Sequence, residues 1–296
     1  MTPRTVSMTF PSIALALALS AVGCASASDS TTQEDLGTTE SSLVEDDAET
    51  SEDDENAESG IEQALSGAEA ANPGGASDPS EADDTVFARI KTNPGLFYKP
   101  AGCITSTLEK TASAVTVTHV FTGCTGPFGL KSFDGTVVST WSRGEGKLVV
   151  THSTTGFRIN EAVINHEATI SYSLAGDVWT RTRKATSSGT NAKGKAFTRE
   201  ANFVVTWNSS SKCLTRDGSA ASTIGNRSVE RKVTGLEVCG VGIRLCPTKG
   251  VIELRRAKTS TNAEVTLTID YEGGEATKVK LPSGKTVKRA LVCARL

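Results

Sequence analysis

The sequence feature that most constrains the fold is an alternation of side chains between Val163 and Leu174. The apolar or ring-bearing residues of this stretch occupy every second position, and Asn, Glu, Thr and Ser lie between them. The residues that share one side are Ile164, His166, Ala168, Ile170, Tyr172 and Leu174. Successive side chains of an extended strand point to opposite faces, so this pattern predicts a strand with one buried face and one solvated face.

Similar alternation recurs along the C-terminal two thirds of the chain. It predicts strands over residues 113–121, 135–142, 146–153, 177–186, 197–207, 251–256, 263–271, 276–281 and 286–293. Turn-forming residues separate these runs at intervals of roughly 8–14 residues, and no sustained helical repeat lies between them. The sequence therefore predicts an all-β domain over residues 85–296. We expect a single antiparallel β-sandwich, or a partly closed β-barrel or meander, of about a dozen short strands.

The N-terminal 23 residues have the organisation of an export signal. Arg4 supplies one positive charge, the apolar run Ile13–Leu19 follows it, and small residues lead to Cys24. An apolar run of this length is too short to span a bilayer stably. We therefore interpret residues 1–23 as a cleaved signal peptide.

The junction Ala21-Val22-Gly23-Cys24 resembles the lipobox of bacterial lipoprotein precursors. In that class the chain is cleaved before the Cys, which then carries a diacylglyceryl group and an N-linked acyl chain such as palmitate. The resemblance implies lipid attachment at Cys24. Because Ala25 rather than Asp follows the Cys, it also implies anchoring in the outer membrane, on its periplasmic or its exterior side. Cleavage elsewhere among the small residues 21–28, which would give a soluble secreted protein, is the alternative.

Residues 24–84 are predicted to form a disordered acidic linker behind the lipidated Cys. Nineteen Asp or Glu lie between Asp29 and Asp84, and no Lys or Arg occurs between Thr5 and Ala88. Large apolar side chains are few, so burial cannot offset the entropy of ordering this segment. Residues 85–296 hold 30 Lys or Arg against 15 Asp or Glu, so the net charge of −3 hides an acidic linker and a basic domain.

The cysteine count agrees with lipidation of Cys24. The chain has seven Cys, and removing Cys24 leaves an even number in the domain. These six are Cys103, Cys124, Cys213, Cys239, Cys246 and Cys293. An exported domain with six Cys predicts three disulfides.

Turn positions favour particular disulfide pairs. Cys213 and Cys239 lie almost symmetrically about Gly225-Asn226, a turn-forming dipeptide between two strand-like runs, so a hairpin would place them opposite each other. The other pairs that we favour are Cys103 with Cys124 and Cys246 with Cys293, and the competing choice is Cys239 with Cys246.

The sequence contains no familiar catalytic or cofactor-binding pattern. It lacks a nucleophile elbow, a zinc-protease helix motif, a phosphate-binding loop and a cluster of paired carboxylates. His119, His152 and His166 fall on inward strand positions and lack the spacing of metal ligands. We interpret them as core residues, and we expect no cofactor and no metal.

Basic residues cluster on several of the expected strands and in one connection. The candidate anion-binding residues are Arg181, Arg183, Lys184, Lys193, Lys195, Arg199, Lys278 and Lys280. Solvation of an exposed sheet face and protection of strand edges against aggregation would each explain them. The alternative is recognition of an anionic surface such as lipopolysaccharide or acidic polysaccharide.

These features predict a non-enzymatic lipoprotein, anchored in the outer membrane, whose basic β domain serves surface interaction or envelope structure. Alternatives are a carrier that binds a lipid or a polyanion and, less favoured, a secreted hydrolase. In a further version of the polyanion hypothesis, the acidic linker competes for the basic face. The membrane is the expected partner through the lipid anchor, specific nucleic-acid binding is not expected, and the sequence names no protein partner.

Overall fold

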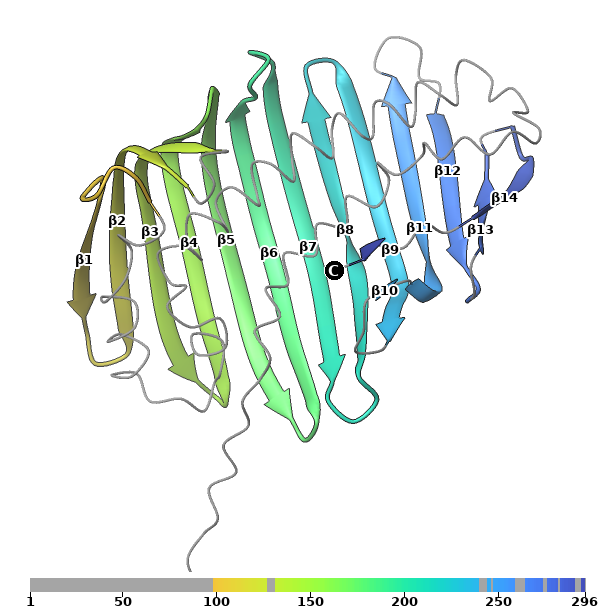
Figure 1. Cartoon of the computed structure of the whole chain (residues 1–296), viewed down its shortest axis with the longest axis horizontal. Helices are drawn as coiled ribbons and strands as arrows, with labels where there is room; N and C mark the ends of the chain where they lie inside the picture. The colour runs from red at the N-terminus through yellow and green to blue at the C-terminus, as the bar shows by residue number, and fades with distance from the viewer. Residues whose placement is uncertain are drawn as a thin grey trace, which may run out of the picture.

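The computed structural model describes residues 98–126, 131–239, 244–245, 247–258, 264–273, 276–281, 283–290 and 294–295 (Figure 1). Thirteen of its strands form one antiparallel sheet in which each strand pairs with the preceding one of the sheet. These strands are β1 (Ile104–Lys110), β2 (Ala114–Thr125), β3 (Ser132–Gly144), β4 (Lys147–Ile159), β5 (Ala162–Ala175), β6 (Val178–Thr190), β7 (Ala196–Asn208), β8 (Cys213–Ile224), β9 (Arg227–Cys239), β11 (Pro247–Lys258), β12 (Glu264–Tyr271), β13 (Ala276–Lys280) and β14 (Thr286–Ala290). The sheet is a meander.

Two short strands lie outside this sheet. β10 (Arg244–Leu245) and β15 (Ala294–Arg295) form a separate antiparallel pair in which Leu245 faces Ala294. β1 and β14 are the two ends of the main sheet and do not pair, so the sheet is open. The described residues include no helix that is long and apolar enough to cross a membrane.

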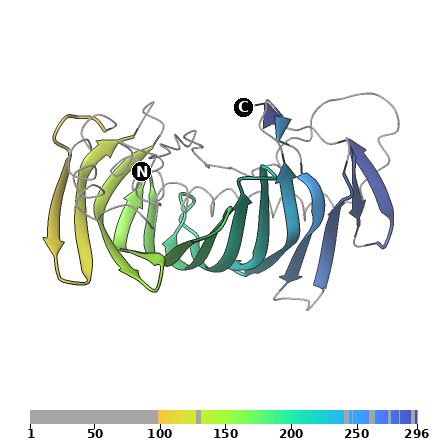
Figure 2. The same ribbon diagram turned by 90° about the horizontal axis from the view of Figure 1, so that it is seen from below.

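The sheet is curved into a trough (Figure 2). Three register shifts contribute to this curvature, because a β-bulge bends a strand and increases its local twist. At each shift a Gly with positive φ donates its backbone N–H to a carboxylate or amide oxygen on the neighbouring strand. The three pairs are Gly123 with Asp134 (3.0 Å), Gly156 with Asn165 (2.8 Å) and Gly235 with Asp217 (2.6 Å).

Burial distinguishes the two faces of the trough. We call the face that carries the buried rows the inner face, and the opposite face the outer face. Residues of the inner face include Val117, Val137, Val150, Ile170, Phe203 and Leu254, each at most 5% exposed. The sheet therefore has one buried face and one more exposed face, as the alternation of residues 163–174 predicts.

The apolar core on the inner face is divided along the sheet. Near β1–β5, Tyr98, Phe121, Phe133 and Phe157 form a cluster of aromatic rings with centroids 5.5–6.3 Å apart. A second cluster surrounds Trp141 on β2–β5. A third extends from β7 to β13 and includes Leu254. β6 and several strands of the third cluster also carry the inward polar residues described below.

The all-β prediction is confirmed, and of the two arrangements expected from the sequence the described strands adopt the meander. Its central strands are longer than expected, with 12–14 residues in each of β2–β9 and β11. β1 was not predicted, because only Ile104 of its seven residues is buried and its alternation is weak.

Two of the predicted disulfides are present. Cys103 is bonded to Cys124, and Cys213 is bonded to Cys239 across the first residue pair of the β8–β9 hairpin. The competing bond between Cys239 and Cys246 is therefore wrong. Cys24, Cys246 and Cys293 lie outside the described residues, as do the predicted signal peptide and linker.

Candidate anion-binding site

The central strands of the trough bring six arginines onto the inner face. We call this set the arginine band: Arg181 and Arg183 on β6, Arg199 on β7, Arg216 on β8, Arg231 on β9 and Arg256 on β11. Strand register places them on one face, because residues directly opposite each other in an antiparallel pair point to the same side. With strands about 4.8 Å apart, five neighbouring strands span about 19 Å.

Cross-strand rows fix the relative positions of the band residues. One row runs from Arg199 through Ser222 and Val229 to Arg256. Another runs from Arg181 through Val205 to Arg216. Arg183 and Arg231 belong to the two rows that lie between these. The six guanidinium groups therefore share one patch and do not form a single line.

Small residues give the long arginine side chains room to lie on the sheet. A row of four alanines crosses β5–β8 beneath the band and ends at Arg231. These residues are Ala168, Ala185, Ala201 and Ala220, each at most 7% exposed. Next to this row the Arg216 guanidinium lies 4.2 Å from the centroid of the Phe203 ring, a cation–π contact.

Gly218 permits the close approach of Phe203. It has φ +143°, and a Cβ at this position would lie 2.1 Å from the Asn202 carbonyl oxygen and 2.7 Å from Phe203 Cα. The register shift between Arg216 and Gly218 lies at the same place. Glycine and bulge together position Arg216 over the aromatic ring.

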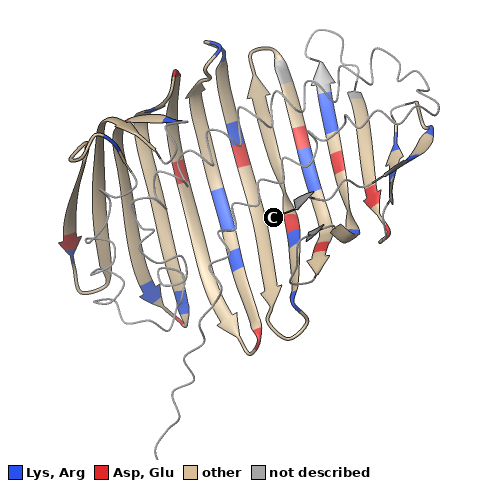
Figure 3. Ribbon diagram, in the orientation of Figure 1, with Lys and Arg blue, Asp and Glu red and all other residues tan. Residues whose placement is uncertain are grey.

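Carboxylates are absent from this face in the part of the sheet that the structure describes. Glu167, Glu200 and Glu230 occupy outward positions on β5, β7 and β9, and all three are exposed. Figure 3 shows Asp and Glu interspersed with Lys and Arg along these ribbons. On the outer face Arg255 and Glu230 approach to 3.6 Å. The inner face is therefore cationic, whereas the outer face carries charges of both signs.

The charges of the band influence one another. Burial, followed by the positive charges of Arg231 and Arg216, lowers the pKa of Arg199 to about 9. Burial, followed by the charge of Arg216, lowers the pKa of Arg183 to about 10. Arg183 is 5% exposed and Arg256 is 4% exposed. Arg183 and Arg199 remain cationic at neutral pH in surroundings that disfavour positive charge, which is the environment in which a bound anion is stabilised most.

The three histidines lie on the same face, toward β1. Each ring Nδ1 is hydrogen-bonded to the hydroxyl of a Ser directly opposite on the neighbouring strand. The pairs are His119 with Ser106 (2.8 Å), His152 with Ser139 (2.9 Å) and His166 with Ser187 (2.8 Å). The prediction that these histidines are buried core residues is confirmed, since none is more than 8% exposed.

Burial keeps the histidines neutral. Desolvation lowers the pKa of His119 and of His166 to about 4. Desolvation also lowers the pKa of His152 to about 3, with smaller contributions from the charges of His166, Arg181 and His119. The imidazoles therefore add no positive charge near pH 7, and the arginines account for the charge of the central inner face.

The structure separates the basic residues expected from the sequence. Arg181, Arg183 and Arg199 are brought together in the band. The other five do not join them: Lys184 lies on the outer face, Lys193 and Lys195 lie in the β6–β7 connection, and Lys278 and Lys280 lie on the outer face of β13. The eight candidate residues therefore do not share a single patch. In place of these lysines the band contains Arg216, Arg231 and Arg256, which the sequence reasoning missed.

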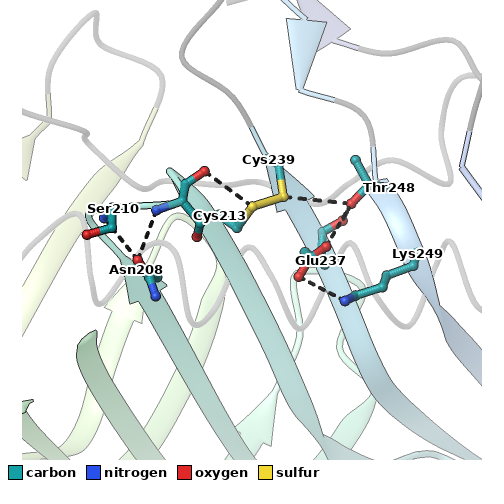
Figure 4. Close-up of a disulfide and its surroundings, with 8 residues drawn as sticks. Asn208, Ser210, Cys213, Glu237, Cys239, Thr248 and Lys249 are labelled. Atoms are coloured by element: carbon teal, nitrogen blue, oxygen red, sulfur yellow. Dashed lines mark hydrogen bonds and ion pairs between the residues drawn. A yellow bond between two sulfur atoms is a disulfide. The ribbon is translucent and has the colours of Figure 1, made fainter. Parts of the chain in front are cut away.

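A second polar cluster surrounds the disulfide at the open end of the β8–β9 hairpin (Figure 4). Asn208 Oδ1 accepts hydrogen bonds from the backbone N–H groups of Ser210 (2.9 Å) and Ser211 (3.0 Å). The Glu237 carboxylate accepts a hydrogen bond from the Thr248 hydroxyl (3.2 Å) and pairs with Lys249 (3.1 Å). These contacts connect the ends of β7, β8, β9 and β11.

Within this cluster, potential metal-ligating atoms of Cys213, Glu237 and Cys239 lie close together. Both sulfur atoms are bonded to each other, so neither is available as a thiolate ligand. In its oxidised form the cluster serves to hold strand ends together.

Comparison of the chain with protein-family models, with curated proteins and with solved structures gives no match. The fold and the site themselves define its class: an open antiparallel meander with an arginine band on its inner face.

Proposed function

We propose that the β domain binds an anionic ligand through the arginine band, as the binding module of an exported, lipid-anchored protein that is not an enzyme. The observation that carries this proposal is the collection of six arginines on the inner face of five neighbouring strands. Guanidinium groups bind carboxylate and phosphate oxygens through paired hydrogen bonds.

The layout favours a ligand with several anionic groups. Six cations distributed over about 19 Å across the strands match repeated charges better than one phosphate or carboxylate. A flexible linear polyanion, such as an acidic polysaccharide or polyphosphate, can follow a concave surface that a flat membrane cannot enter. The lipid anchor expected at Cys24 would hold such a module at a bacterial envelope, where acidic polymers are exposed.

The apolar clusters on both sides of the band favour a second candidate ligand, an anionic amphiphile. Val117 and Trp141 lie on the β1 side of the band, and Leu267 and Ile269 lie on its other side, on β12. The headgroup of such a ligand would meet the arginines, and its acyl chain would lie beside these apolar rows. Binding of a short-chain alkyl phosphate but not of polyphosphate would favour this carrier function.

The test uses fluorescently labelled polyphosphate and the full chain, with binding measured by anisotropy at two salt concentrations. The variant Arg183→Gln/Arg199→Gln/Arg216→Gln removes three charges from the band. The matched control, Lys184→Gln/Lys193→Gln/Lys195→Gln, removes three charges from β6 and its connection to β7 while leaving the inner face intact.

We expect the band variant to bind at least tenfold more weakly and to show a smaller dependence on salt, because fewer cations contact the polymer. The control variant should bind within about twofold of the parent chain. Circular dichroism of both variants verifies the fold. Equal losses in the two variants would show that general basicity, and not the band, binds the ligand.

A further inference from the structure

We infer that the acidic segment of residues 45–58 of the same chain binds the arginine band and competes with external anions for it. This inference rests on the proposed function and adds the regulation of that site. It follows from the charge of the segment, the charge of the band and the length of chain that joins them.

The two charge patterns are complementary. Nine of the fourteen residues from Glu45 to Glu58 are Asp or Glu, and this is the densest acidic stretch of the chain. No Lys or Arg occurs between Thr5 and Ala88, so the segment contains no cations that could neutralise it locally. The segment and the band carry charges of opposite sign, so Coulomb attraction favours contact between them.

The connecting chain is long enough to allow this contact. Thirty-nine residues lie between Glu58 and Tyr98, where the described domain begins. A flexible chain of this length has an r.m.s. span of about 35 Å. Tyr98 packs against Phe133 of β3, and with strands about 4.8 Å apart the centre of the band on β8 lies about 24 Å from β3. The required distance is therefore shorter than the average reach of the chain.

Tethering makes even weak binding effective. A short flexible connection supplies an effective concentration in the millimolar range. A segment whose own dissociation constant is about 0.1 mM would then lower the apparent affinity for an external polyanion about tenfold. Salt weakens this contact and the binding of the polyanion together, so competition is greatest at low ionic strength.

The test compares three full-length chains by their binding of labelled polyphosphate at low salt. In the first variant all nine acids of residues 45–58 are replaced, Glu by Gln and Asp by Asn. In the matched control nine of the ten other acids between Asp29 and Asp84 are replaced in the same way, which gives the same net charge. The parent chain is the reference.

We expect the first variant to bind polyphosphate about tenfold more tightly than the parent, and the control to bind within about threefold of it. A synthetic peptide of residues 45–58 should inhibit binding to the first variant, and its Gln/Asn counterpart should not. Adding Arg183→Gln, Arg199→Gln and Arg216→Gln should abolish both effects.

The outcomes separate the two hypotheses. If the parent binds polyphosphate through the band but neutralising residues 45–58 does not raise its affinity, the competition is refuted and the proposed function stands. Equal gains in the first variant and the control would refute the assignment to this segment. If even the neutralised chain fails to bind polyphosphate and the alkyl phosphate, the proposed function itself is refuted.

Discussion

Lowering the pH from 7.5 to 5.5 is expected to destabilise the domain by about 4 kcal/mol, through its three buried histidines. His119, His152 and His166 are the three His of the chain. Their folded pKa values are about 4, 3 and 4, against 6.5 for an exposed imidazole. Each lowering is caused mainly by burial, because the folded domain disfavours a charged ring.

The direction of this pH effect depends on whether the folded or the unfolded chain binds more protons. The unfolded chain takes up protons as the pH falls through 6.5, whereas the folded chain does so only near pH 3–4. The stabilisation is therefore complete above about pH 6.5 and is lost progressively toward pH 4. One pH unit below 6.5, each histidine contributes about 1.4 kcal/mol of destabilisation, so three contribute about 4 kcal/mol.

The measurement is urea unfolding at pH 7.5, 6.5 and 5.5, followed by tryptophan fluorescence. In the variant His119→Gln/His152→Gln/His166→Gln the pH dependence in this range should largely disappear, even though the variant is less stable at pH 7.5. The carboxylates are the same in both chains, so the comparison isolates the histidines. An unfolding free energy of the parent that is the same at pH 7.5 and 5.5 would refute the reasoning, as would an unchanged pH dependence in the variant.

Three further predictions concern the disulfide, a strand glycine and the anchor. Replacing Cys213 and Cys239 together by Ala should cost about 2–4 kcal/mol in urea unfolding, because the bond closes a loop of some 25 residues in the unfolded chain; an unchanged midpoint would contradict this. Gly218→Ala should lower the melting temperature far more than Gly225→Ala, since a Cβ at Gly218 meets backbone atoms and one at Gly225 meets nothing within 4 Å. Cys24→Ser should abolish incorporation of labelled palmitate by cells that express the precursor, and persistent labelling would exclude this attachment site.

The strands and two disulfides were predictable because their signals are local. Alternation with a period of two identifies a strand without knowledge of its neighbours, and Cys213 and Cys239 flank one hairpin symmetrically. The bond between Cys246 and Cys293 stays a prediction, to be checked by peptide mapping without reduction. The adjacent residues Leu245 and Ala294 pair directly, which is consistent with it.

Only three of the six arginines in the band were predicted from the sequence, because membership of the band depends on which face of the sheet each residue occupies. Arg255 and Arg256 are neighbours in sequence, yet register places Arg255 opposite Glu230 on the outer face and Arg256 opposite Val229 on the inner face. Bulges add to the difficulty, because an extra residue reverses the parity of the strand beyond it. A count of alternating positions that ignores the shift at Gly235 assigns one end of β9 to the wrong face.

The meander topology has a consequence for how the chain acquires its structure. Every strand of the main sheet pairs with the preceding one of that sheet, so its contacts join segments that are close in sequence. Sheets built from such local pairings close small loops at each step, which favours rapid, sequential folding. The first five strands with Tyr98 already bring together most of the aromatic cluster and the Cys103–Cys124 bond. The N-terminal half can therefore begin to fold before the C-terminal strands have joined the sheet. A gain or loss of one hairpin would lengthen or shorten the trough without rearranging the rest.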